Sequence, residues 1–504
     1  MLFDLNTDDR GILDPVFDVC IVGAGPAGIT LARRLSALGH SVALMEAGGL
    51  EITDESQDLY KGDIVGLGYW DLDSVRIRAF GGCSGHWSGR CRAIDAEAFG
   101  TSPVRPRSWP ITKTDLDPYQ AETSDILDLS RPEMPPDLPV MQAEDRLRGI
   151  QFLHSPPTRF GEKYPDALAA DPRITCVLNA NLVDLDLAPD LATVQGGLFK
   201  SYVQGDPGVT VRARIFVVAM GGFETPRMLL NFTRQKPQGI GNDHDLVGRY
   251  FCEHPSFDIA AAVLTGAQGI EQDNFAGSQA LLESEGILGF TIKINWRAYP
   301  EEPLWKAGKQ LVECFSPLTR DLTESALGRR PVCRTDGGVE EFLARRWPDA
   351  NPTGWIWLGI EQALNPDSRV KLGTEKDRFG LTRMQFDWRL TDLDYRTMQV
   401  AMAAFGTHLA EQDLGRIRIA DWLLEDNPRL PGSDGGGYHQ MCTTRMDDDP
   451  RFGVVDRNCR VHGMANLYVA GSSVFGTPSY CNPTFTIVQL ALRLGDHLGG
   501  EALL

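Results

Sequence analysis

Residues Phe17–Gly49 read F-D-V-C-I-V-G-A-G-P-A-G-I-T-L-A-R-R-L-S-A-L-G-H-S-V-A-L-M-E-A-G-G. Apolar runs at Val19–Val22 and Val42–Met45 predict two short strands, and the apolar spacing over Ala27–Leu38 predicts a helix between them. A strand, a helix and a second strand in this order are typical of a parallel α/β unit. The chain is therefore expected to contain an α/β domain near its N-terminus.

The loop between the first strand and the helix carries the pattern G-x-G-x-x-G, at Gly23, Gly25 and Gly28. Such glycines permit a tight turn, let the backbone approach a pyrophosphate and bring the helix close to the sheet. Glu46 follows the second strand, where a carboxylate accepts hydrogen bonds from a ribose hydroxyl. A dinucleotide site is predicted, with a glycine-rich turn in an unrelated α/β unit as the alternative. Glu46 would repel the 2′-phosphate of NADP, but the motif does not separate FAD from NAD.

Composition places the chain among ordinary globular proteins. It has 504 residues, 42% hydrophobic and 23% charged, which predicts two to four domains or two large ones. There are 49 basic and 68 acidic residues, for a net charge of -19, which argues against nucleic acid and anionic membranes as partners. The acidic balance mildly favours cationic substrates or reflects only a solvated surface.

Targeting and metal signals are missing from the sequence. We find no apolar run long enough to cross a bilayer, and the first residues lack the basic start and apolar core of a secretory signal. Ten cysteines occur without a C-x-x-C pair, which argues against a zinc module and a disulfide scaffold. We therefore expect a reduced, cytoplasmic protein without a metal site.

Three further segments carry motifs, and the first of them is dense in glycine. Residues Arg76–Asp95 read R-I-R-A-F-G-G-C-S-G-H-W-S-G-R-C-R-A-I-D, a loop that suits close backbone approach to a flat ring system. Residues Phe216–Leu230 read F-V-V-A-M-G-G-F-E-T-P-R-M-L-L and predict a strand, a turn and a helix with Pro226 near its first turn. Residues Asn466–Leu498 predict a strand, a loop and an amphipathic helix that begins near Asn482 and Pro483.

Together these segments resemble the glucose-methanol-choline (GMC) family of FAD-dependent alcohol oxidoreductases. V-G-R-Y-F-C-E-H-P at Val247–Pro255 extends the likeness over most of the chain. W-P-I-T-K-T-D-L-D-P-Y at Trp109–Tyr119 and E-Q-A-L-N-P-D-S-R-V at Glu361–Val370 narrow it. Both look like the bacterial branch that contains pyranose 2-oxidase and the glycoside 3-oxidases and 3-dehydrogenases.

The resemblance implies an α/β fold with two interleaved domains. A Rossmann-like FAD-binding domain would be assembled from residues 1–95, 172–255 and 440–504. An α+β substrate-binding domain, built on an antiparallel sheet, would be formed by residues 96–171 and 256–439.

The resemblance also implies a reaction. It predicts oxidation of a secondary alcohol of a sugar, glycoside or cyclitol to a ketone, by hydride transfer to the flavin N5. His439 matches the family's general base, and a neutral imidazole with a pKa of ~6.5 is suited to take the hydroxyl proton, a contribution of ~10²–10⁴ in rate. Asn482 matches the residue that holds the alcohol oxygen. Its alternative role is an N-cap of the C-terminal helix.

The cofactor contacts implied by the family are spread over four parts of the chain. His86 matches the histidine that carries a covalent link to FAD in pyranose 2-oxidase, whereas related glycoside-oxidising enzymes keep the histidine without the bond, so both states stay open. Ser88 is expected to face the flavin N5. The predicted cofactor-binding residues are Gly23, Gly25, Gly28, Glu46, Gly82, Ser84, His86, Trp87, Ser88, Gly471, Pro483 and Thr484.

Four residues depart from the branch pattern. Gln440 and Cys442 replace a histidine and a glycine beside His439, and Gly476 and Cys481 replace a proline and a small apolar residue near Asn482. These changes predict an altered pocket beside the base, and they leave open whether Cys442 and Cys481 are neighbours.

Other reactions and partners are considered beside the sugar oxidation. The alternative is a GMC-fold flavoprotein that acts on a specialised natural-product intermediate, by another alcohol oxidation or by a non-redox, lyase-type reaction. A binding protein with a vestigial site is the third interpretation. The partners expected are a small alcohol substrate and an electron acceptor, which is O₂, a quinone or a redox protein.

Overall fold

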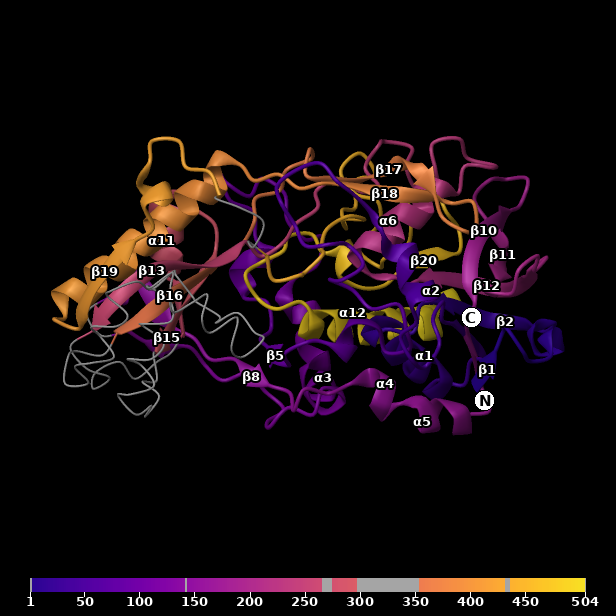
Figure 1. Ribbon diagram of the computed structural model, residues 1–504. Helices are drawn as coiled ribbons and strands as arrows, with labels where there is room; N and C mark the ends of the chain where they lie inside the picture. The colour runs from indigo at the N-terminus through magenta and orange to yellow at the C-terminus, as the bar shows by residue number, and fades with distance from the viewer. Residues whose placement is uncertain (1, 141–142, 265–273, 297–352, 431–435, 504) are drawn as a thin grey trace, which may run out of the picture.

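The computed structural model of the chain describes residues 2–140, 143–264, 274–296, 353–430 and 436–503 (Figure 1). Two bodies lie side by side in this view. A parallel sheet with its helices occupies one end, and an antiparallel sheet with the long helix α11 (Asp392–Glu411) occupies the other. The α/β fold class, with an antiparallel sheet beside the nucleotide-type unit, is confirmed.

The larger sheet confirms the elements predicted from the opening stretch. The predicted strand, helix and strand are β2, α1 (Pro26–Ala37) and β3, and β2 pairs with β3 in parallel. The outer strands β11 and β10 continue from β12 as an antiparallel meander. The strand order is β1 (Leu2–Asp4), β9 (Ile174–Leu178), β3 (Val42–Met45), β2 (Val16–Val22), β12 (Val209–Val218), β11 (Val194–Lys200) and β10 (Asn181–Leu187), with β20 (Leu467–Val469) beside the C-terminal half of β12.

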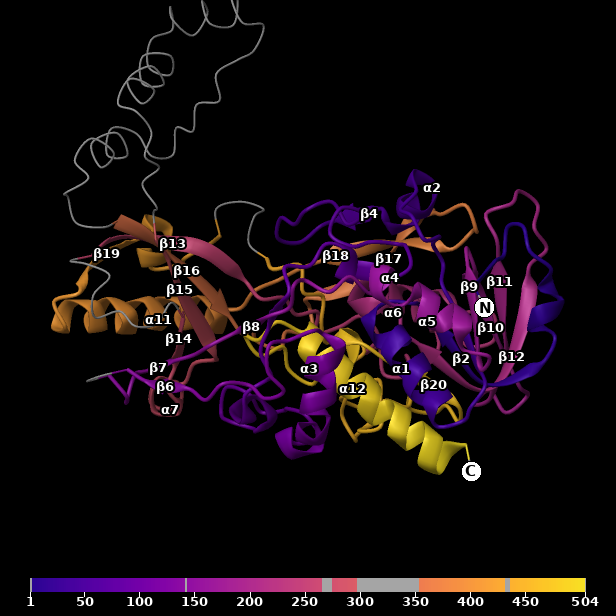
Figure 2. The ribbon, with the colours of Figure 1, turned by 90° about the horizontal axis from the view of Figure 1, so that it is seen from below.

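Helix α12 (Thr484–His497) lies against α1, and Figure 2 shows the two helices side by side. Buried apolar side chains on one stripe of α12, such as Phe485, Val488 and Leu492, explain why this helix packs into the core. The helix starts within two residues of the predicted point. Pro483 occupies the N-cap position without a side-chain bond, so Asn482 is not the cap of this helix.

Helix α6 (Gly221–Asn231) corrects one prediction. The helix begins at Gly221, earlier than expected, and Pro226 therefore lies in its second turn rather than its first. Proline lacks an N–H group, so the carbonyl of Gly222, four residues earlier, loses its helical donor. The Thr443 hydroxyl donates to this carbonyl at 2.6 Å, which replaces the missing bond. A contact from 221 residues away thus lets the helix tolerate its proline.

The second sheet is antiparallel, and its buried face packs against α11 around Phe290, Ile356 and Phe405. Capping by Thr391 and Asp394 starts that helix. The strand order is β19 (Gly415–Ile419), β13 (Ser256–Leu264), β16 (Thr353–Ile360), β15 (Phe290–Trp296), β14 (Asn274–Gly277), β7 (Leu147–Gly149) and β6 (Leu138–Pro139).

A third, small sheet complicates the predicted division into domains. Strands β17 (Arg369–Lys376) and β18 (Thr382–Asp387) come from the stretch assigned to the substrate domain. β18 pairs in parallel with β4 (Gly62–Ile64), which comes from the N-terminal stretch assigned to the FAD domain. The division into residues 1–95, 172–255 and 440–504 against 96–171 and 256–439 stays a prediction.

Short elements complete the connections. Across the described ranges, no helix combines the length and the apolar character needed to cross a membrane. The shorter helices and the remaining strand pair are α2 (Asp54–Gln57), α3 (Gln120–Ile126), α4 (Phe160–Lys163), α5 (Pro165–Ala170), α7 (Gln279–Glu285), β5 (Arg90–Cys91) and β8 (Leu153–His154).

Candidate active site

A cavity of about 380 Å³ lies where four neighbouring parallel strands end. Strands β3, β2, β12 and β20 run side by side in the same direction, so the residues that follow them meet at one edge of the sheet. Ligands of open α/β sheets bind at this carboxyl edge. Glu46, Gly23, Ala219 and Gly471, which follow these strands, all line the cavity.

The structure brings nearly all of the predicted site residues together. His439 and Asn482 line the same cavity as the predicted cofactor-binding residues, and Gly28 is the one predicted residue outside the lining. The lining includes Gly23, Gly25, Glu46, Gly82, Ser84, His86, Trp87, Ser88, Gly471, Pro483 and Thr484.

The glycines in and beside the cavity fall into two kinds. A Cβ added to Gly28 would lie 1.9 Å from the carbonyl oxygen of Gly23, so this glycine lets α1 pack against the loop. A Cβ added to Gly25, Gly221 or Gly471 would meet no atom of the described chain within 4 Å. These three glycines leave a cradle along the cavity wall that side chains would fill, as a dinucleotide requires. The residues present therefore fit FAD.

Glu46 is held in place by the backbone. Its two carboxylate oxygens accept hydrogen bonds from the Ala24 N–H at 2.7 Å and the Gly48 N–H at 2.8 Å. Burial raises the pKa of this carboxyl, and the backbone donors offset part of that rise. Each carboxylate oxygen keeps acceptor capacity for a further donor, such as a ribose hydroxyl.

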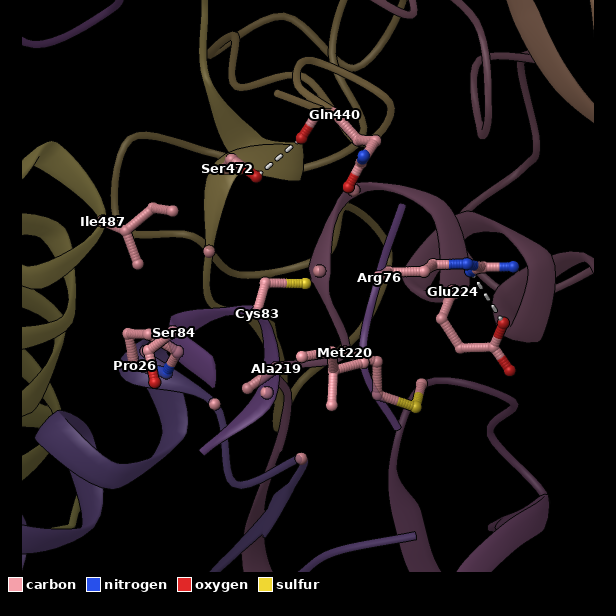
Figure 3. Close-up of a pocket in the computed structure, with 18 of the residues that line it drawn as sticks. Pro26, Arg76, Cys83, Ser84, Ala219, Met220, Glu224, Gln440, Ser472 and Ile487 are labelled. Carbon is pink, nitrogen blue, oxygen red and sulfur yellow. Dashed lines mark hydrogen bonds and ion pairs between the residues drawn. The ribbon is translucent and has the colours of Figure 1, made fainter. Parts of the chain in front are cut away.

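The loop around residues 82–88 presents His86 to the cavity. The Ser84 hydroxyl donates to the Gly81 carbonyl at 2.7 Å, and Arg159 donates to the carbonyls of Ser84 and Trp87, so the loop has a defined shape. Within the described part of the chain, the His86 ring has no hydrogen-bond partner, and burial lowers its pKa. Figure 3 labels Cys83 and Ser84 of this loop among the residues that line the cavity.

One wall of the cavity is a buried ion cluster centred on Glu224 of α6. Its carboxylate pairs with Arg76 at 3.4 Å, Arg78 at 3.4 Å and Arg227 at 2.7 Å, and the Arg76 pair is drawn in Figure 3. The nearby positive charges hold the pKa of Glu224 below its usual value despite burial. The E-T-P-R motif therefore ties α6 to the loop that precedes His86.

At the other end of the cavity, His439 lines the wall and contacts His254, which lies behind it. His439 Nδ1 lies 2.9 Å from His254 Nδ1, and His254 Nε2 lies 3.2 Å from the Pro478 carbonyl oxygen. A carbonyl only accepts, so the proton of His254 is on Nε2 and its Nδ1 is an acceptor. His439 must then donate from Nδ1, which leaves the lone pair of its neutral ring on Nε2. The hydrogen-bond chain thereby selects one tautomer of His439.

Glu253 holds the loop that carries His439. Its carboxylate accepts hydrogen bonds from the backbone N–H groups of His439 at 2.7 Å, Gly437 at 3.2 Å and His254 at 2.5 Å, and from the Tyr69 hydroxyl at 2.9 Å. Burial without a cationic partner raises the pKa of Glu253 to about 7, although these donors favour the ionised form.

The base nitrogen faces Asn482. The Asn482 side-chain Nδ2 lies 3.3 Å from His439 Nε2 and donates to it in the tautomer derived above. Burial, the neighbouring His254 and Arg90 lower the pKa of His439 well below 6.5, and burial lowers the pKa of His254 to about 4. Both rings are therefore neutral at pH 7, and a neutral imidazole is the form that accepts a proton.

The departures from the family pattern separate into two groups. Gln440 lines the cavity, and its carbonyl accepts from the Ser472 hydroxyl at 2.7 Å. Cys442 is buried and absent from the described lining, so its effect on the pocket stays a prediction. Its backbone has φ +67°, which explains the glycine of the related pattern. The thiol beside it is Cys252, not Cys481.

Two residues of this site escaped the sequence interpretation. Glu253 and His254 were visible only as part of the V-G-R-Y-F-C-E-H-P pattern, without a role. His254 lies 185 positions before His439, and no local spacing indicates that their rings meet. The one signal in the sequence was that two ionisable residues, Glu253 and His254, stand next to each other before Pro255. In the described ranges, no group of three or more His, Cys, Asp or Glu residues is arranged to hold a metal ion.

Comparison with known proteins also indicates an oxidoreductase. Residues 365–491 match the family model described as GMC oxidoreductase. The chain is 25% identical to the 6'''-hydroxyparomomycin C oxidase of Streptomyces lividus, over 98% of this chain and 94% of that protein. It is 24% identical to the C-glycoside 3-oxidase of Microbacterium trichothecenolyticum, over 96% of each.

The fold agrees with that of solved structures. Pyridoxine 4-oxidase from Mesorbium loti superimposes with a TM-score of 0.55 at 16% identity, covering 95% of this chain and 99% of that one. Residues 365–491 therefore match the GMC oxidoreductase family, and the chain as a whole is similar to oxidases over nearly its full length. It is therefore an FAD-dependent oxidoreductase that acts on CH–OH groups.

Proposed function

We propose that this protein oxidises a secondary alcohol of a carbohydrate-like substrate to a ketone, with His439 as general base and Asn482 as the residue that holds the alcohol oxygen. The observation that carries the proposal is the pair of His439 Nε2 and Asn482 Nδ2, 3.3 Å apart in the cavity that also contains the dinucleotide cradle. A substrate hydroxyl that approaches both atoms from the cavity donates to Nε2 in place of the Asn482 N–H and accepts from Nδ2.

Each residue has a defined task in this reaction. When bound, FAD supplies the acceptor for the hydride of the carbinol carbon, and O₂, a quinone or a redox protein removes the two electrons afterwards. The hydroxyl proton goes to His439 Nε2, so the product leaves as a neutral ketone. Asn482 fixes the oxygen and thereby the direction of the C–H bond.

His254 and Glu253 act through His439. The His254 ring accepts the Nδ1 proton of His439 and so keeps Nε2 free for the substrate. The Glu253 carboxylate holds the backbone N–H of His439 at 2.7 Å, which sets the position of the ring. Both are positioning residues, because neither lines the described cavity.

The substrate class is supported by relatives that align over nearly the whole chain. One is named as a C-glycoside 3-oxidase and another as a 6'''-hydroxyparomomycin C oxidase. We propose a sugar, glycoside or cyclitol accordingly. Retention of both His439 and Asn482 favours alcohol oxidation over a lyase-type reaction.

The attachment of the cofactor is a separate part of the proposal. His86 faces the cavity with a ring that lacks a hydrogen-bond partner among the described residues, and its lowered pKa keeps the ring neutral at pH 7. We propose that His86 contacts the flavin. Acid precipitation of the holoprotein tells a covalent bond from a contact: yellow colour in the pellet shows the bond, and colour wholly in the supernatant excludes it.

The proposal is tested by anaerobic mixing of the holoprotein with a panel of sugar alcohols, glycosides and cyclitols. At least one is expected to bleach the oxidised flavin. His439→Ala should slow that bleaching by ~10²–10⁴ while retaining FAD, because it removes the proton acceptor. His244→Ala, at an exposed position, is the control and should reduce at the parental rate. Reduction of His439→Ala as fast as the parent would refute the base assignment.

A further inference from the structure

Most charged side chains of the cavity have a polar partner within the described protein. Among the described residues, five charged ones line the cavity: Glu46, Arg76, Arg78, Arg90 and Glu224. Glu46 is bonded by backbone N–H groups, and Arg76 and Arg78 pair with Glu224. Arg90 is different, because it forms no ion pair with any residue in the described ranges.

Arg90 is nevertheless held in a defined position. It lies on β5, which pairs with β8, and its Nη2 donates to the side-chain oxygen of Asn274 at 2.7 Å. The guanidinium carbon lies 3.7 Å from the ring centre of Phe152 and 5.5 Å from that of Trp357. Aromatic faces and a neutral amide fix the group without cancelling its charge.

Arg90 is partly buried, and it differs in its pairing from the fully buried arginines of the described chain. Every arginine that the described structure buries forms an ion pair with Asp or Glu: Arg76, Arg78, Arg92, Arg105, Arg227 and Arg445. The chain has 68 acidic residues against 49 basic ones, so carboxylates are abundant. Carboxylates are therefore available in the sequence, yet Arg90 pairs with none of those in the described structure.

The position of Arg90 connects it with the catalytic end of the cavity. Its charge contributes to the lowered pKa of His439, so the two groups are electrostatic neighbours. Burial lowers the pKa of Arg90 itself to about 10, which leaves it cationic at neutral pH. A desolvated cation without a counter-ion is costly, and an incoming anion relieves that cost.

We propose that Arg90 binds an anionic group of the substrate, so that the enzyme acts on an acidic carbohydrate-like alcohol that carries a carboxylate, such as a uronic acid or its glycoside. This inference rests on the proposed function, because it places the anion in the cavity where the alcohol is oxidised. Guanidinium and carboxylate form parallel, charge-assisted hydrogen bonds, and Asn274 leaves the remaining N–H groups of Arg90 for that purpose. The same charge disfavours polycationic substrates.

A matched pair of ligands tests the inference. Methyl β-D-glucuronide and methyl β-D-glucoside differ only in a carboxylate against a hydroxymethyl group. Binding is measured by calorimetry with FAD-loaded His439→Ala, in which oxidation is suppressed. The glucuronide is expected to bind at least tenfold more tightly. Adding Arg90→Gln should remove that preference and leave glucoside binding unchanged, and Arg90→Lys should keep part of it.

Controls separate the role of Arg90 from a general loss of charge. Arg234→Gln removes one positive charge from a half-exposed surface position and should keep the preference for the glucuronide. Equal affinity for the two ligands, absence of saturable glucuronide binding, or a preference that survives Arg90→Gln would overturn the inference. So would loss of FAD from Arg90→Gln, because Arg90 would then be a cofactor contact. Tighter binding of glucose 6-phosphate than of the glucuronide would overturn the assignment to a carboxylate.

Failure of the inference and failure of the proposed function give different results. If the parent reduces its flavin with neutral glycosides as well as with uronates, the function stands and the anion site falls. If no alcohol reduces the flavin but the glucuronide binds in an Arg90-dependent way, the anion site stands and the oxidation falls.

Discussion

The two ends of the cavity differ in the parts of the protein that form them. At the nucleotide end, the wall consists of backbone: three glycines whose Cβ positions are open, and a carboxylate held by two backbone N–H groups. At the catalytic end, the wall includes the side chains of His439 and Asn482, which contact each other, and His254 contacts His439 from behind the wall. The nucleotide end therefore depends on backbone conformations that glycine allows. The catalytic end depends on which side chains donate and accept hydrogen bonds.

The chain distance between the partners differs as well. Gly23 and Gly28 are five residues apart, and their contact is set by one turn and one helix. His254 and His439 are 185 residues apart, and their contact requires that two remote loops meet across an isolated bridge between Cys252 and Met441. Local geometry therefore produces the cofactor end, while tertiary folding produces the catalytic end.

The largest expected effect separates two glycines within the nucleotide end. Gly28→Ala would place a Cβ 1.9 Å from the Gly23 carbonyl, so the apoprotein is expected to unfold at a much lower temperature and to give no holoprotein. Gly25→Ala meets no described atom within 4 Å, so the apoprotein should keep its stability and lose affinity for FAD. Thermal unfolding and FAD titration of both variants measure this. Equal thermal stability of the two would contradict the division of roles.

A smaller effect tests the catalytic end. His254→Ala removes the acceptor for the Nδ1 proton of His439 and should slow anaerobic flavin reduction by up to about 10²-fold, with FAD retained. His254→Asn supplies an amide oxygen as acceptor and should recover part of the rate. Recovery would not be expected if His254 served only to fill space.

The pH profile adds a second readout for the same variant. The pKa of His439 is lowered, so the neutral base persists below pH 6.5, and the parent should keep its plateau there and lose rate only at more acidic pH. His254 contributes to that lowering, so His254→Ala should move the acid limb toward higher pH. If the acid limb of the pH profile did not move, His254 would not influence the pKa of His439.

The smallest expected effect concerns the hydrogen bond from the Thr443 hydroxyl to the Gly222 carbonyl. Thr443→Val leaves the Gly222 carbonyl of α6 without its donor, so the free energy of unfolding should fall by about 1–3 kcal/mol. Thr444→Val is a matched control, because the buried Thr444 hydroxyl has no partner among the described residues, and this variant should be neutral or slightly stabilising. Urea titrations measure both. A loss in Thr444→Val as large as in Thr443→Val would contradict the role of the bond.

Much of the fold followed from local patterns, with instructive exceptions. The first strand, helix and strand were predicted within three residues at each boundary. Pro226 misled the prediction of α6, because its missing bond is replaced by Thr443 from a distant loop. The pairing of β18 with β4 was not predictable either, since neither strand carries a signal for its partner.

The glycine motif with its flanking strands was enough to predict a dinucleotide cofactor, and local spacing was enough to match His439 and Asn482 to a family pattern. These features depend on contiguous residues, whose backbone conformations and spacing are local properties. Only the tertiary structure decided which nitrogen of His439 is free, that Cys442 lies outside the cavity and that Arg90 faces it without an ion-pair partner in the described chain. Those properties depend on which groups from distant parts of the chain are buried next to one another. The spacing of residues along the chain does not indicate this.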